Sequence, residues 1–130
     1  MNGFLRKLFG DQGERAAAKF LKKLGMRVLK RQYLTRYGEI DLIMLDGDTI
    51  VFVEVKTRKS GASGSPSERV DQKKRENSTK TGLAFLKQHK LLGHRSRFDV
   101  VSVVWPEGVR TPTIEHFKHA FEAVDFGQMY

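Results

Sequence analysis

The sequence predicts a single α/β domain in which helices pack against one β-sheet. Three observations lead to this prediction: an amphipathic helical pattern near the N-terminus, two apolar strands around an Asp-Gly turn, and a buried strand pattern after a second helical segment. A chain of 130 residues can bury one core, and neither a repeat nor a break in composition divides it. We therefore expect one domain over residues 1–130, with residues 1–9 as an N-terminal extension and residues 60–67 as a flexible loop.

The first helix is expected over Asp11–Leu24, and a strand follows it over Met26–Tyr33. Apolar side chains recur there at helical spacing, and Gly25 is a suitable end for the helix. These side chains are Ala16, Ala17, Phe20, Leu21 and Leu24. Glu14 would lie in the first turn, where the helix dipole favours an acid, so a purely structural role accounts for it on this pattern alone.

The next two segments, Gly38–Ile43 and Val51–Lys56, are expected to pair as an antiparallel hairpin. Asp46-Gly47-Asp48 separates them, and an Asp-Gly dipeptide between two alternating apolar runs is a strong hairpin signal. The turn therefore brings two strands that both carry acids side by side.

The register of this hairpin decides whether its charged side chains meet. Either two-residue turn, Asp46-Gly47 or Gly47-Asp48, places Asp41, Glu54 and Lys56 on one face of the sheet. The opposite face then carries Ile40, Leu42, Val51, Val53 and Val55. A three-residue turn would separate the charged residues unless a bulge restored the face.

Downstream of the hairpin, the segment Ser60–Ser67 is rich in small polar residues and predicts a mobile loop. This loop either closes over bound nucleic acid or is a plain connection. A helix is expected over Glu68–His89, a buried strand over Arg97–Trp105, and a last helix over Glu115–Phe126. The last helix would turn Phe117, Ala120, Phe121 and Val124 inward.

The acids of the hairpin indicate metal chemistry. Two converging carboxylates repel each other, and a hard cation such as Mg²⁺ or Mn²⁺ compensates for this repulsion. Lys56 could hold an attacking water or steady the charge on a phosphate. The structural alternative is an ion-pair cluster that fixes the strand register. Because two acids, Asp41 and Glu54, face a single base, we favour phosphodiester hydrolysis.

A family resemblance points the same way. Asp41, a spacer of a dozen residues and Glu54-x-Lys56 resemble the signature of the PD-(D/E)XK nuclease superfamily, which includes restriction endonucleases and archaeal-type Holliday junction resolvases. Further segments are Gly13-Glu14, Gly38–Ile43, Phe52–Arg58, Arg97–Val101, and His116 before Ala120-Phe121. With them the chain resembles the bacterial YraN family, also called UPF0102, from about Gly10 to Phe121.

The resemblance implies a restriction endonuclease-like three-layer core (αβββαβ) with a central mixed sheet flanked by helices. It implies that Asp41 and Glu54 bind Mg²⁺ or Mn²⁺, that the Val55 carbonyl completes the metal shell, that Lys56 orients the nucleophilic water, and that Glu14 supports the site from the first helix. The family usually has a Lys-Gln pair after the motif strand, where this chain has Lys74-Arg75. Arginine can contact a phosphate but cannot accept a hydrogen bond.

Composition is compatible with a nucleic-acid partner. The chain has 24 Lys and Arg against 15 Asp and Glu, a formal net charge of +9. Phosphate backbones attract such surfaces, although a high charge also keeps a small protein in solution. Among the basic residues we expect nucleic-acid contacts from Arg58, Lys59, Lys74 and Arg75.

Asp99 and the histidines are expected to have structural roles. Asp99 could assist a metal, but Arg97 or the backbone is expected to satisfy it within the buried strand. His116 and His119 lie three residues apart without a convincing set of further ligands, and His116 is expected to help pack the last helix.

The leading hypothesis is therefore a metal-dependent endonuclease that hydrolyses DNA, including branched or structured DNA, through a metal-activated water. DNA is preferred over RNA as the partner. The alternative is a non-catalytic nucleic-acid-binding module with the nuclease fold, and a purely structural assembly protein is a third, weaker hypothesis. The chain has no cysteine and no apolar stretch of membrane-spanning length, so we expect a cytoplasmic protein without a membrane partner. Resolvases cut two strands, and by this analogy a homodimer is considered.

Overall fold

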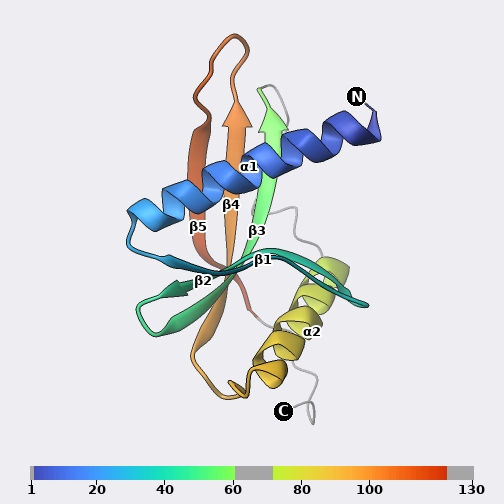
Figure 1. The fold of residues 1–130 in the computed structure, drawn as a ribbon, viewed down its shortest axis with the longest axis vertical. Helices are drawn as coiled ribbons and strands as arrows, with labels where there is room; N and C mark the ends of the chain where they lie inside the picture. Colours follow the sequence, from blue (N-terminus) through green and yellow to red (C-terminus); the bar gives the residue numbers. More distant parts are fainter. Residues whose placement is uncertain (1, 61–71, 123–130) are drawn as a thin grey trace.

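In the computed structural model, which describes residues 2–60 and 72–122, five strands form one mixed sheet in the order β1-β2-β3-β4-β5 (Figure 1). The strands are β1 (Arg27–Thr35), β2 (Gly38–Asp46), β3 (Thr49–Lys59), β4 (Ser96–Trp105) and β5 (Thr113–Phe121). β3 and β4 run parallel, and α2 (Gln72–Gln88) lies in the crossover that a parallel pair requires. The other neighbouring strands pair antiparallel.

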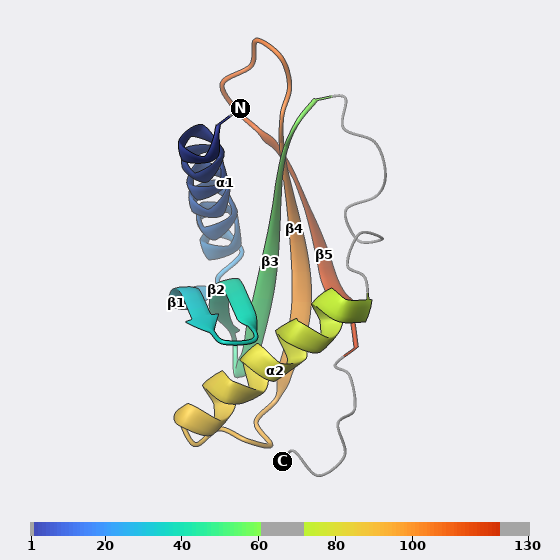
Figure 2. The ribbon, with the colours of Figure 1, turned by 90° about the vertical axis from the view of Figure 1, so that its right-hand side faces the viewer.

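The sheet lies between the two helices, so the α/β three-layer architecture with a mixed sheet is confirmed (Figure 2). The cluster on the α1 (Gly3–Lys23) side includes Ala17, Ala18, Leu21, Leu42, Met44, Val51, Val53, Val101 and Val103. The cluster on the α2 side includes Ile43, Ile50, Phe52, Phe85, Leu86, Phe98 and Val100. The central strands β3 and β4 are therefore covered on both faces, and both contain buried apolar runs, Ile50–Val53 in β3 and Val100–Val101 in β4.

Helix α1 begins earlier than the sequence predicts. Asn2 caps the helix by accepting a hydrogen bond from the Leu5 N–H at 2.9 Å, so the helix starts at Gly3 and not at Asp11. Glu14 consequently lies in the middle of α1, not in its first turn. The apolar pattern did not reveal this start because Phe4, Leu5 and Leu8 are exposed and bury no continuous stripe.

The hairpin forms in the register that places Asp46 opposite Thr49, with Gly47-Asp48 as the two-residue turn. Gly47 adopts a positive φ of 61°, which suits this turn. The pairing of β2 with β3 ends at Leu42 and Val53, while β2 continues to pair with β1. Figure 1 shows β3 turning upward while β1 and β2 run across the picture.

The curvature of β2 changes one residue of the predicted face. Ile40 was expected to share a face with Leu42, but Ile40 packs in the α2 cluster beside Ile43. The physical reason is that simple alternation holds only while β2 remains in the plane of the sheet. The change occurs next to Asp41, and it bears directly on the candidate site.

The last segment corrects the prediction of a helix over 115–126, because its described part, Thr113–Phe121, forms β5. Ile114 packs on the α1 side, whereas Phe117, Ala120 and Phe121 pack on the α2 side. An irregularity at His119, which has a φ of 57°, separates the pairing of Phe117 from that of Phe121. Phe117, Ala120 and Phe121 of this strand are therefore three and four residues apart on one side, a spacing that is typical of a helix.

The edge of β4 gives the physical reason for a strand here. Without β5, the outer edge of the long strand β4 would leave its N–H and C=O groups unpaired.

Three expectations lie outside the described residues: the loop over 61–67, the start of the second helix at 68–71, and the inward position of Val124. Ser60 itself donates its N–H to the Trp105 carbonyl.

Candidate metal centre

The candidate site lies where β2 separates from β3. The Val55 N–H of β3 donates a hydrogen bond to Asp41 Oδ2 at 2.8 Å. In a continued ladder this N–H would pair with the backbone of β2, so the Asp41 carboxylate takes that place at the separation. The carboxylate is therefore held at the fork of the two strands, where both layers of the protein can reach it.

Two further acids converge on Asp41. Glu14 reaches it from α1, and Glu39 precedes it by two residues on β2. One carboxylate oxygen from each of these three residues lies within 4.8 Å of the others. Oxygen ligands in this number and at this spacing fit a hard divalent cation such as Mg²⁺ or Mn²⁺.

Gly13 explains how Glu14 comes so close to the sheet. A Cβ atom at Gly13 would collide with the side chain of Thr57 on β3. The absence of this Cβ lets α1 pack tightly on β3 and carries Glu14 toward Asp41.

Gln32 orients Glu14 from β1. Its side-chain amide donates to Glu14 Oε1 and to Asp11 Oδ1, each at 3.1 Å. Its backbone has a φ of 49°, an uncommon value for a residue other than glycine. Gln32 was not predicted as a site residue, because a polar residue in an edge strand has no pattern that distinguishes it.

Glu54 approaches from the α2 side of the sheet. Its side chain is 15% exposed, and its Oε1 lies 3.0 Å from Lys74 Nζ. Lys74 comes from the first turn of α2, so this ion pair ties the helix to the motif strand. Lys56 lies two residues beyond Glu54 on β3 and shares its face by strand alternation.

The electrostatics of the site favour the binding of a cation. Burial and, second, the negative charge of Glu54 raise the pKa of Asp41 to about 8, against the opposing hydrogen bond from Val55. Burial also raises the pKa of Glu14, against the hydrogen bond from Gln32. Proton binding and cation binding both relieve this excess of negative charge.

Asp99 belongs to a separate network. Its carboxylate accepts hydrogen bonds from Arg97 at 3.0 and 3.2 Å and from the His119 N–H at 2.9 Å, and it lies 2.7 Å from His116 Nε2. Burial opposes the ionisation of Asp99, but these hydrogen bonds outweigh it and lower its pKa. The expectation that Arg97 and the backbone satisfy Asp99 is confirmed. His116 thus helps pack the last segment, although that segment is a strand.

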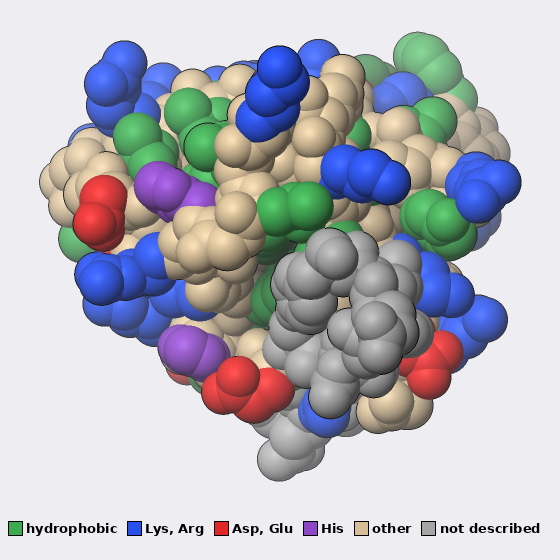
Figure 3. Space-filling model, turned by 90° about the horizontal axis from the view of Figure 1, so that it is seen from below, with side chains coloured by type: hydrophobic (Ala, Val, Ile, Leu, Met, Phe, Trp, Pro, Cys, Tyr) green, Lys and Arg blue, Asp and Glu red, His purple; other side chains and the backbone are tan. Residues whose placement is uncertain are grey.

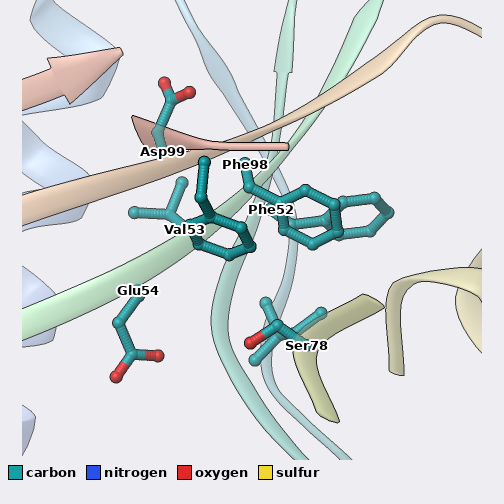
Figure 4. Close-up of a pocket in the computed structure, with 8 residues that line it drawn as sticks. Phe52, Val53, Glu54, Ser78, Phe98 and Asp99 are labelled. Atoms are coloured by element: carbon teal, nitrogen blue, oxygen red, sulfur yellow. The ribbon is translucent and has the colours of Figure 1, made fainter. Parts of the chain in front are cut away.

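Figure 4 shows that the carboxylates of Glu54 and Asp99 point in different directions. Between them lies a cavity of about 10 Å³, lined in part by Phe52, Ser78 and Phe98, which has room for about one water molecule. Asp99 therefore does not join Glu54 in one ligand set.

The structure brings together most of the residues expected at the site. Glu14 lies beside Asp41, and the Val55 N–H binds the Asp41 carboxylate. Glu54 is close enough to Asp41 to raise its pKa, and it forms an ion pair with Lys74. Arg75 follows Lys74 on α2. The Val55 contact is made by its N–H, whereas the resemblance implies a role for its carbonyl.

Two expected nucleic-acid contacts lie elsewhere on β3. Lys59 is five residues beyond Glu54, roughly 16 Å along the strand, and lines a surface cavity with Phe9 and Trp105. Arg58 precedes it and is half-buried. Glu39 was missed as a site residue, although its position two residues before Asp41 was a usable signal.

Comparison with known proteins identifies the family. Residues 13–103 match the model of the family described as "Uncharacterised protein family UPF0102". The chain belongs to the UPF0102 family. The matched region of this UPF0102 protein contains every acid of the candidate site, from Glu14 to Glu54, and also Lys74.

Relatives of the UPF0102 protein match most of its length. A UPF0102 protein of Rhodopirellula baltica is 45% identical over 93% of this chain and 74% of its own length. One from Syntrophus aciditrophicus is 46% identical over 87% of both chains. One from Pelotomaculum thermopropionicum is 40% identical over 89% of this chain and 97% of its own length.

Neither α1 nor α2, the helices of the described part, is long and apolar enough to cross a membrane.

Proposed function

We propose that this UPF0102 protein is a divalent-metal-dependent endonuclease that hydrolyses phosphodiester bonds in DNA, with branched or structured DNA among its substrates. The observation that carries this proposal is the convergence of Glu14, Glu39 and Asp41 at the fork between β2 and β3, with Glu54 close enough to raise the pKa of Asp41. A purely structural ion-pair cluster does not account for so many acids at one place.

The donor set suits Mg²⁺ or Mn²⁺. Asp41 and Glu54 would hold the cation, together with the Val55 carbonyl, while Glu14 and Glu39 are the acids that could complete its shell. When bound, such a cation lowers the pKa of a water ligand and neutralises charge that develops on a phosphate.

The chain's own residues would position the substrate and the water. The Val55 N–H fixes the orientation of Asp41. Lys56, on the face of Glu54, would hold the attacking water, and Lys74 and Arg75 at the start of α2 would contact phosphate oxygens. No covalent intermediate with the protein is needed for this reaction.

A second candidate function is a nucleic-acid-binding module without catalysis. The 3.0 Å ion pair between Lys74 and Glu54 favours it, since this contact occupies an oxygen of an expected metal ligand. Arg75, where the family usually has glutamine, favours it as well.

Cleavage assays decide between the two functions. Wild type, D41N and E54Q would be incubated with single-stranded, duplex, flap and four-way-junction DNA in Mg²⁺, Mn²⁺ or EDTA. We expect metal-dependent cutting by the wild type and a loss of roughly 100-fold or more in both variants, since even an outer-shell partner is worth about 10–100-fold.

The matched control is E107Q, which removes an exposed acid in the connection between β4 and β5. It should cut like the wild type. Equal cutting by D41N and the wild type would overturn the metal site, and DNA binding without cutting on any substrate would support the binding module.

A further inference from the structure

The turn between β1 and β2 carries a group of cations around one tyrosine. The Arg36 guanidinium lies 5.0 Å from the centre of the Tyr37 ring, and Arg36 Nη2 donates a hydrogen bond to the Tyr37 hydroxyl at 2.9 Å. Lys80 Nζ, from α2, lies 5.5 Å from the same ring centre. The turn and α2 thus both contribute positive charge around Tyr37, where Arg36 is exposed and Tyr37 and Lys80 are partly exposed.

This group is held in place by partly buried hydrogen bonds between the turn and α2. The Tyr37 N–H donates to Thr35 Oγ1 at 3.1 Å, and Thr35 Oγ1 lies 3.1 Å from Thr81 Oγ1 on α2. Thr81 is buried and also donates to the Asn77 carbonyl. The turn is therefore fixed on the helix, and the cations are presented in a defined arrangement.

The cations continue along α2. Lys73, Lys80 and Lys87 are seven residues apart, a spacing that returns to nearly the same side of a helix. They extend over about 21 Å, the length of about six base-pair steps of duplex DNA. The hydrogen bond from Arg36 and, to a smaller extent, the positive charges of Arg36, Lys80 and Lys87 lower the pKa of Tyr37.

Lys73, Lys80 and Lys87 form a stripe of cations whose position can be compared with that of the candidate site. Lys73 precedes Lys74, the partner of Glu54, and Tyr37 precedes Glu39 by two residues on the chain. Figure 2 shows α2 passing beside the turn between β1 and β2. Figure 3, seen from the α2 end of the molecule, shows Lys and Arg side chains spread over the visible face with few acids between them.

We infer that Arg36, Tyr37 and Lys80, with Lys73 and Lys87, form a binding site for the phosphodiester backbone of a nucleic acid, along which the substrate leaves the metal centre. Guanidinium and ammonium groups neutralise phosphates, and the tyrosine hydroxyl holds Arg36 in place for this contact. This inference rests on the proposed function for the nature of the ligand, and it names the surface over which that ligand lies.

Binding measurements without metal test the inference separately from cleavage. The anisotropy of labelled duplex and single-stranded DNA would be followed in EDTA over a series of NaCl concentrations for wild type, R36A/K80A and Y37F. Each lost phosphate contact should weaken duplex binding about eightfold at about 0.1 M salt and reduce the salt slope by about 0.9. We therefore expect about a 60-fold loss for R36A/K80A, and a smaller loss for Y37F because only the orientation of Arg36 changes.

The matched control is K22A/K23A, which removes the same charge from exposed lysines in the last turn of α1. It should bind like the wild type, and all variants should show the unfolding midpoint of the wild type. If R36A/K80A does not fold, K80A alone should show the eightfold loss. Equal losses in R36A/K80A and K22A/K23A would overturn the inference, as would no binding by the wild type. Cutting by the wild type together with unchanged binding by R36A/K80A would overturn the inference and leave the nuclease intact.

Discussion

Asp41 combines a structural contact with an electrostatic cost. Its carboxylate accepts the Val55 N–H and lies close to Glu14, Glu39 and Glu54. An asparagine could keep the hydrogen bond to Val55, because its side-chain oxygen is also an acceptor. Replacement of Asp41 by asparagine therefore removes the negative charge and keeps the shape of the side chain.

D41N should stabilise the metal-free protein, and increasingly so as the pH rises. The pKa of Asp41 is raised from 3.8 to about 8, so the folded state binds a proton that the unfolded state releases over this range. Stability of the wild type therefore falls as the pH rises from about 4 to about 8, and D41N lacks this loss. Denaturant unfolding in EDTA at both ends of the range measures the effect.

The control for D41N is D48N, at a turn position where the side chain is 74% exposed. D48N should differ from the wild type by a similar small amount at every pH, because exposed ion pairs contribute about 0–1 kcal/mol. A stability difference between D41N and wild type that does not change with pH would contradict the buried, charge-coupled environment of Asp41.

Helix α1 contains two glycines in its interior, Gly10 and Gly13, that differ in their surroundings. Gly10 has open space where a Cβ would point, whereas a Cβ at Gly13 would meet Thr57. We expect G10A to stabilise the fold by about 0.5–1 kcal/mol through helix propensity. G13A should instead destabilise it by about 1–3 kcal/mol, because α1 must move away from β3.

Chemical denaturation of the two glycine variants checks this contrast. The same movement of α1 would withdraw Glu14 from Asp41, so G13A should also weaken Mn²⁺ binding while G10A does not. Equal stability of G10A and G13A would mean that α1 does not pack on Thr57 as the structure shows.

For the whole molecule, a divalent cation should act as a stabilising ligand. Binding to the folded state alone contributes about 2.7 kcal/mol when the cation is at a hundredfold excess over its Kd. We expect Mn²⁺ to raise the Tm of the wild type by several degrees and to leave the Tm of D41N unchanged. Calorimetry with and without EDTA measures this, and an equal rise in both proteins would place the cation elsewhere.

Sequence patterns were sufficient for the features that depend on neighbouring residues. The Asp-Gly turn and the alternation of apolar residues predicted the hairpin, and the observed register uses one of the two expected turns, Gly47-Asp48. The apolar run of β4 likewise predicted a central strand. The expected contact of Lys74 with nucleic acid stays a prediction, and its ion pair with Glu54 was not predicted.

Contacts between distant segments were beyond these patterns. β5 was predicted as a helix, because the irregularity at His119 gives Phe117, Ala120 and Phe121 helical spacing on one side of a strand. Gln32 was not predicted to contact Glu14, since nothing local relates an edge strand to the middle of α1.

The sequence by itself determined the family, the hairpin and the acids of the motif strands, since the turn and the alternating side chains act over a few residues. Only the tertiary structure decided that Glu14 and Glu39 meet Asp41, and that the cations of Arg36 and Lys80 share one tyrosine. The physical reason is that β2 curves away from β3 while two helices pack on opposite faces of the sheet. Local periodicity in the sequence does not predict such long-range packing.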